Sequence, residues 1–86
     1  MSHEETGRLG GDQKLVVMAN QIAAFFESQP REEAQAGVAK HINDFWEPRM
    51  RRKFFAIVDA GGAGLKPLVI AAAAQVRRPA VETPAG

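Results

Sequence analysis

The stretch His41–Phe55, HINDFWEPRMRRKFF, is the most informative part of this chain. Pro48 lacks a backbone N–H and disfavours helix in the residue before it, so we expect one helix to end near Trp46 and another to begin near Pro48. Aromatic residues and a dense basic cluster surround this break. Their combination is typical of a docking surface and not of a catalytic site.

Two apolar stripes precede the proline break. The first follows Asp12, a good helix N-cap, and consists of residues spaced three and four apart: Leu15, Met18, Ala19, Ile22, Phe25 and Phe26. Ser28 and Pro30 then interrupt the chain. The second stripe consists of Ala34, Val38, His41, Ile42 and Phe45. Each spacing predicts an amphipathic helix with one buried face.

Two further helices are predicted after the break. The apolar face of the third contains Met50, Phe54, Ile57 and Val58, and that of the fourth contains Leu68, Val69, Ala72 and Val76. Gly61 suits a left-handed C-cap and Pro67 suits a first helical residue, although Lys66 is a poor N-cap. The sequence therefore predicts an all-α fold, a small compact bundle of about four short helices. We expect a helical domain at 12–76 and flexible tails at 1–11 and 77–86.

The composition indicates a thin core, for which oligomerisation or a partner subunit is the expected remedy. Hydrophobic residues make up 45% of the 86 residues, but fifteen of them are alanine, and the chain has no cysteine for a disulfide. The net charge of +1 lacks the strong basic excess of a general nucleic-acid binder. No stretch is long and apolar enough to span a membrane, and the N-terminus does not resemble a signal peptide, so we expect a cytoplasmic protein.

Six residues around the proline break form the contact surface that we expect. On a helical wheel, Trp46 and Phe55 fall beside the stripes that contain Phe45 and Phe54, so both rings belong either to the core or to a partner surface. The basic cluster of the third helix is either a solvated face or a site for an acidic protein surface or for phosphate. The expected contact residues are Phe45, Trp46, Arg49, Arg51, Arg52 and Phe55.

No catalytic or metal-binding constellation is evident in the sequence. His41 lies in an apolar stripe, so we expect a packed histidine with one hydrogen-bonded ring nitrogen. His41, Asp44 and Glu47 follow one another at steps of three and drift around the helix, which argues against a shared metal ion. The glycine-rich turn after the third helix lacks the context of a phosphate loop. We expect no cofactor in this chain and no independent enzyme activity.

Three segments carry a family resemblance: KLVVMANQIAAFFESQP at Lys14–Pro30, VAKHINDFWEPRMRRKF at Val38–Phe54 and GGAGLKPLVIAA at Gly61–Ala72. Together they resemble the delta subunit of cytoplasmic NAD-dependent, molybdenum-containing formate dehydrogenases. The resemblance implies a small noncatalytic subunit of a larger complex. Other chains of that complex would hold a molybdopterin guanine dinucleotide cofactor, iron–sulfur clusters, FMN and the NAD site.

The role implied by the resemblance is support for assembly, cofactor maturation or stability of the molybdenum-bearing alpha subunit, which is the partner that we expect. Two alternatives stay open at this point. In the first alternative, the chain is a chaperone that leaves the alpha subunit after maturation. In the second, it is a small nucleic-acid-binding or regulatory helical protein. Binding of the last kind would weaken steeply with salt.

Overall fold

The computed structural model describes residues 11–79, and all of the regular structure in that range is helical. The elements are α2 (Gly11–Phe26), α3 (Arg31–Phe45), α4 (Pro48–Asp59), α5 (Pro67–Ala72) and the short 3₁₀ helix η1 (Ala73–Gln75). The predicted all-α class is therefore confirmed. Gly11 already belongs to α2, and residues 1–10 and 80–86 of the predicted tails lie outside the described range.

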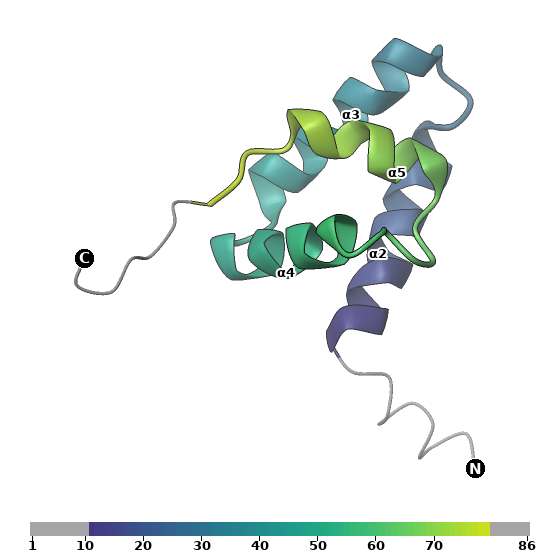
Figure 1. Ribbon diagram of the computed structural model, residues 1–86. Coiled ribbons are helices and arrows are strands. Elements are labelled where there is room, and N and C mark those ends of the chain that lie inside the picture. The colour runs from purple at the N-terminus through teal and green to yellow at the C-terminus, as the bar shows by residue number, and fades with distance from the viewer. Residues whose placement is uncertain (1–10, 80–86) are drawn as a thin grey trace, which may run out of the picture.

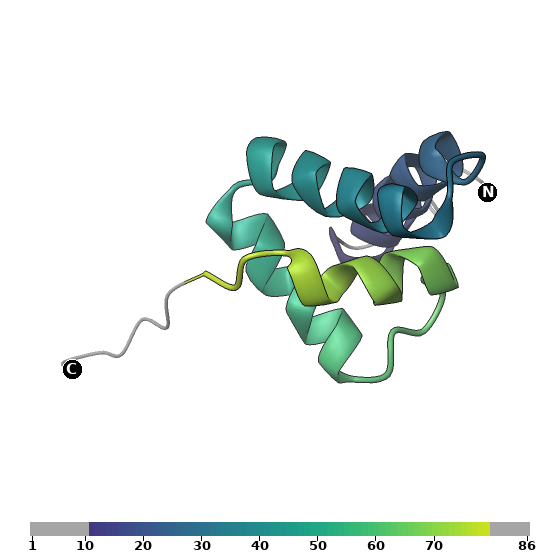
Figure 2. The same cartoon turned by 90° about the horizontal axis from the view of Figure 1, so that it is seen from above.

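The helices are arranged around the α2–α3 pair (Figure 1). After the link at residues 27–30, α3 turns back beside α2, and α4 then passes the N-terminal half of α2. The chain returns through a glycine-rich loop, so that α5 and η1 lie along α3 (Figure 2). Segments that are distant in the sequence are thereby brought around one core.

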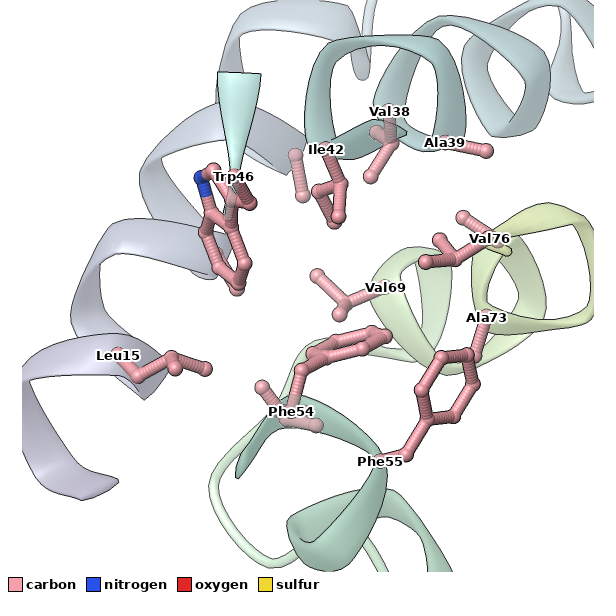
Figure 3. Close-up of a cluster of buried hydrophobic side chains, with 14 residues drawn as sticks. Leu15, Val38, Ala39, Ile42, Trp46, Phe54, Phe55, Val69, Ala73 and Val76 are labelled. Atoms are coloured by element: carbon pink, nitrogen blue, oxygen red, sulfur yellow. The ribbon is translucent and has the colours of Figure 1, made fainter. Parts of the chain in front are cut away.

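The core is built from side chains of every helix (Figure 3). Its largest fully buried residues are Phe54, Ile42, Val38 and Val69. Burial of each such side chain contributes roughly 1.5–3 kcal/mol. The Phe54 ring lies at the centre of an aromatic chain, 5.9 Å from the ring of Trp46 and 5.3 Å from that of Phe55, both in edge-to-face geometry. This geometry is favourable for aromatic pairs.

The helix ends follow the expected backbone chemistry. Pro48 and Pro67 are the first residues of α4 and α5. At the end of α4, Gly61 N–H donates to Val58 O at 3.0 Å and Gly62 N–H donates to Ile57 O at 2.8 Å, with positive φ at both glycines. This pair of bonds is a Schellman motif, so the predicted left-handed cap is confirmed.

Two asparagine side chains hold the ends of the α5–η1 segment. Asn20 Nδ2 donates to Gly64 O at 2.9 Å, and Asn20 Oδ1 accepts from Lys66 N–H at 2.9 Å. Asn43 Nδ2 donates to Gln75 O at 3.2 Å, and Asn43 Oδ1 accepts from Arg77 N–H at 2.8 Å. Lys66 offers no side-chain cap to α5, and Asn20 satisfies its backbone N–H instead.

Candidate interaction surface

The structure divides the predicted aromatic anchors between core and surface. Trp46 is 5% exposed and Phe55 is 6% exposed, whereas Phe45 is 71% exposed. The core interpretation of Trp46 and Phe55 therefore holds, and neither ring stands on the surface as an anchor. Trp46 is buried because the chain turns inward after α3, so that its ring packs against Phe54 between α2 and α3. Of these three rings, only that of Phe45 is accessible to a partner.

The basic cluster of α4 is also divided. Arg51 turns back toward the fold, where its Nε donates to Trp46 O at 3.3 Å and its Nη1 donates to Arg77 O at 2.7 Å. Lys53 lies near the start of α2, with its Nζ 3.7 Å from Asp12 Oδ1. Arg49 and Arg52 are exposed. Arg51 therefore braces the α3–α4 connection against the segment after η1, and Arg49, Arg52 and Lys53 form the outer basic face of α4.

A second arginine, Arg78, packs over the ring of Phe55 at the edge of the core. Arg78 makes a two-point contact with Asp59, from Nη2 to Oδ1 at 2.9 Å and from Nη1 to Oδ2 at 3.2 Å. Its guanidinium carbon also lies 4.1 Å from the centre of the Phe55 ring. The hydrogen bonds from Arg78 lower the pKa of Asp59 and raise that of Arg78. This contact joins the C-terminal end of the described chain to α4.

The structure exposes apolar residues that the sequence stripes placed inside the bundle. Phe25 is 75% exposed and Met18 is 39% exposed, whereas Leu15, Ala19 and Ala23 form the buried face of α2. The predicted buried face of α2 was therefore wrong for Met18 and Phe25. The physical reason is that the apolar arc of this helix is wider than the surface that α3 and α4 cover.

These exposed residues line a groove between α2 and α3. The groove encloses about 300 Å³, and we call it the α2–α3 groove. Its lining residues are Met18, Gln21, Ile22, Phe25, His41 and Trp46. The exposed ring of Phe45 continues this surface, since its centre lies 4.8 Å from that of His41.

His41 is a groove residue and not a core residue. Its side chain is half-buried, and its ring is tilted against that of Phe45. The hydrogen bond that we expected at a ring nitrogen is absent among residues 11–79. In the same range, no group of three or more histidine, cysteine, aspartate or glutamate residues is placed to hold a metal ion. The arrangement is suited to contact with apolar and aromatic groups of another molecule.

The wide apolar arc of α2 was the sequence signal that could have revealed the groove. On a wheel of 100° per residue, Phe25 and Met18 lie more than 100° from Ala23, which is a broader spread than one neighbouring helix covers. The expected contact set did not contain Met18, Phe25 or His41. The structure joins these three to Phe45, and it places Arg49 and Arg52 on α4.

Within the described residues, no helix combines the length and apolar character that crossing a bilayer requires.

Comparisons with known proteins identify the family. No curated protein and no solved structure matches the chain. A family model, described as NADH-dependant formate dehydrogenase delta subunit FdsD, matches residues 14–73. That range runs from the first turn of α2 to the start of η1, and covers most of the 86 residues. The chain therefore belongs to the family of formate dehydrogenase delta subunits.

Proposed function

We propose that this chain is a noncatalytic small subunit that supports assembly, cofactor maturation or stability of the molybdenum-bearing alpha subunit. Membership of the delta-subunit family is the observation that carries the proposal, because the match spans nearly the whole helical domain. In this proposal the complex is cytoplasmic and oxidises formate with NAD. The delta chain acts by binding and not by chemistry.

The chemical groups of the chain are consistent with a binding role. The sequence has no cysteine and no tyrosine, and one of its two serines, Ser28, lies in the turn between α2 and α3. Nucleophilic catalysis needs a nucleophile, a base and an orienting group in mutual contact. By contrast, a groove with exposed aromatic rings and a helix with outward arginines offers the residue types that carry most binding energy at interfaces.

The cofactors of the reaction are assigned in this proposal to the partner subunits. Iron–sulfur clusters are held by cysteine thiolates, and this chain has none. The described residues also offer no three-residue group of metal ligands. The donor set of the chain is therefore consistent with a subunit that does not ligate an iron–sulfur cluster, and in this proposal molybdopterin guanine dinucleotide, FMN and NAD are likewise held by the partner subunits.

Purification of the tagged chain from its native host under mild conditions tests the proposal. We expect stoichiometric recovery of molybdenum-bearing and iron–sulfur subunits that reduce NAD with formate. In a matched purification through a tag on the alpha subunit, active complex with little or no delta chain would instead favour a transient chaperone. Recovery of the chain alone, or with nucleic acid in a salt-sensitive manner, would refute the subunit assignment.

The role in maturation is tested separately by removing the chain from the host. The remaining complex is then purified, and its subunit ratio, molybdenum content and formate oxidation are measured. Loss of molybdenum from an otherwise complete complex would indicate cofactor maturation, whereas loss of the alpha subunit itself would indicate stability. An unchanged complex with full activity would contradict both roles.

A further inference from the structure

The α2–α3 groove gathers the most exposed apolar side chains of the described chain. Among residues 11–79, the two most exposed large hydrophobic side chains are Phe25 at 75% and Phe45 at 71%, and Met18 is also exposed. All three lie in or beside the same groove. Scattered apolar residues are ordinary on a protein surface, but a contiguous aromatic patch around a hollow indicates a binding site.

The groove opens on the side of α2 and α3 that lies opposite α5. Residues two positions apart in a helix point about 200° apart, so Met18 lies opposite Asn20, and His41 lies opposite Asn43. Both asparagines hold the ends of the α5–η1 segment. The groove residues therefore face the side that α5 does not occupy. A further helix on that side would contact both α2 and α3.

The helix α4, which begins two residues after Trp46 at one end of the groove, is rich in basic residues. Trp46 lines the groove and directly precedes the connection to α4. Lys53 lies beside Gly11 and Asp12 at the start of α2, so the first two turns of α4 lie where α2 begins and α3 ends. The α4 sequence PRMRRKFFAIVD has four basic residues and one acidic residue, a net charge of +3 (4 − 1). Arg51 is turned inward, which leaves Arg49, Arg52 and Lys53 on the outer face.

We propose that the α2–α3 groove binds an amphipathic helix of another formate dehydrogenase subunit. The apolar residues of that helix, spaced three and four apart, seat between Phe25, His41 and Phe45, and its carboxylates meet the basic face of α4. This inference rests on the proposed function and adds the surface and the chemistry of its partner.

Charge complementarity favours another subunit over a second copy of this chain. In a symmetric dimer through the groove, each copy would bring the same basic α4 toward the interface. Of the carboxylates of α2 and α3, Asp12 lies near Lys53 and Asp44 is paired with Lys40 of its own chain, while Glu32 and Glu33 lie in the first turn of α3, at the end away from α4. A second copy therefore supplies little negative charge to α4, whereas an acidic amphipathic helix supplies both the apolar ridge and the carboxylates.

Photo-crosslinking in the purified complex tests this placement directly. Benzoylphenylalanine is introduced at Phe25 or Phe45 in the groove, and at Val17 or Ile70 as exposed apolar controls outside it. We expect the two groove positions to crosslink to one segment of another subunit, with apolar residues at helical spacing and adjacent carboxylates. We expect the control positions not to crosslink to that segment. Crosslinks from the groove to a second copy, to a basic segment or to no subunit would overturn the proposal.

Paired substitutions measure the contribution of the groove to binding. The double variant Phe25→Ser with Phe45→Ser should lower the ratio of recovered partner subunits to delta chain by about tenfold or more. The double variant Val17→Ser with Ile70→Ser should leave this ratio unchanged. Thermal unfolding of both isolated full-length variants should be similar, because all four side chains are exposed.

The outcomes separate failure of the groove from failure of the proposed function. Recovery of the complex by the unsubstituted chain and equally by the groove variant would overturn the groove proposal alone. Failure of the unsubstituted chain to recover any partner subunit would overturn the proposed function, and the groove proposal with it. A tenfold loss of recovered partner subunits in the groove variant would support the groove. The same loss in a separate double variant, Arg49→Glu with Lys53→Glu, would support the acidic character of the partner.

Discussion

Replacing Gly37 by alanine should destabilise this protein, although alanine is the better helix former. Gly37 lies in the middle of α3, where alanine is favoured over glycine by about 1 kcal/mol. The ring of Phe26, at the end of α2, packs directly over the Cα atom of Gly37. A Cβ atom built at Gly37 would lie 2.5 Å from Cε1 and 2.6 Å from Cδ1 of that ring, which is closer than real Cβ contacts allow.

The size of the effect follows from two opposing contributions. The Phe26 ring is half-buried and packs edge-to-face against Phe25, with ring centres 5.1 Å apart, so it cannot move without losing contacts. Forcing extra volume into such a contact costs about 1–3 kcal/mol. After subtraction of the gain of about 1 kcal/mol in helix propensity, Gly37→Ala should lower the free energy of unfolding by roughly 0–2 kcal/mol.

A double-mutant cycle with Phe26→Ala separates the two contributions. In the Phe26→Ala background the steric conflict is gone, so Gly37→Ala should stabilise by about 1 kcal/mol, with a coupling energy of about 1–3 kcal/mol between the two positions. Urea unfolding is followed by the fluorescence of Trp46, the only tryptophan of the chain, which is buried. The exposed neighbour Ala36 provides the control, since Ala36→Gly should cost only the propensity difference of about 1 kcal/mol.

The opposite outcome would contradict the packing of Phe26 over Gly37. If Gly37→Ala stabilises the otherwise unchanged protein by the full propensity difference, and Phe26→Ala does not alter that gain, the close packing of Phe26 over Gly37 does not exist in solution. The bundle would then hold α2 and α3 further apart than the structure shows.

Three further predictions concern polar contacts. Asn20→Ala removes the bonds to the loop before α5 and should lower the free energy of unfolding by about 1–3 kcal/mol, measured by urea unfolding. Arg51→Gln removes donors to two backbone carbonyls and should cost about 1–2 kcal/mol, whereas Arg49→Gln should stay within about 0.5 kcal/mol. Asp59→Asn should destabilise the protein at neutral pH, and this effect should vanish in acid. The hydrogen bond from Arg78 lowers the folded-state pKa of Asp59 below its ordinary value of 3.8. The stability that the Asp59 carboxylate contributes is therefore present above pH 3.8 and is lost as the pH falls through the lowered pKa.

Each of these predictions has an outcome that contradicts it. An Asn20→Ala variant with unchanged unfolding would mean that water replaces both bonds at no cost. Equal effects of the Arg51 and Arg49 substitutions would show that the inward contacts of Arg51 do not stabilise the fold. A difference between Asp59→Asn and the unsubstituted chain that persists in strong acid would show that charge is not its cause.

The helix boundaries could be predicted because they depend on local backbone chemistry. Pro48 and Pro67 begin helices since proline has no N–H to donate and a fixed φ, and Gly61 ends one since it accepts a positive φ. These properties belong to the residue itself, whatever surrounds it. The same locality explains why the four-helix, all-α class was predicted correctly.

The buried faces and the contact residues were harder to predict. On a continuous helix the adjacent residues Phe45 and Trp46 would differ by only about 100°, but α3 ends at Phe45 and Trp46 has an extended backbone, so the course of the chain after the helix determines which ring is buried. Arg51 belongs to a basic run in the sequence, yet one of its two hydrogen-bond acceptors is the carbonyl oxygen of Arg77, 26 positions further along. Such pairings depend on how distant segments meet, which no local pattern records.

The number of helices, their ends and the delta-subunit family could be read from the sequence, because they follow from propensities, proline and glycine positions and short motifs. The burial of Trp46, the outward position of Phe25 and Phe45, and the hydrogen bonds of Asn20 to a segment more than forty positions away emerge only in the folded arrangement. Burial is a property of how the helices pack together. A side chain leaves water only where another segment of the fold covers it.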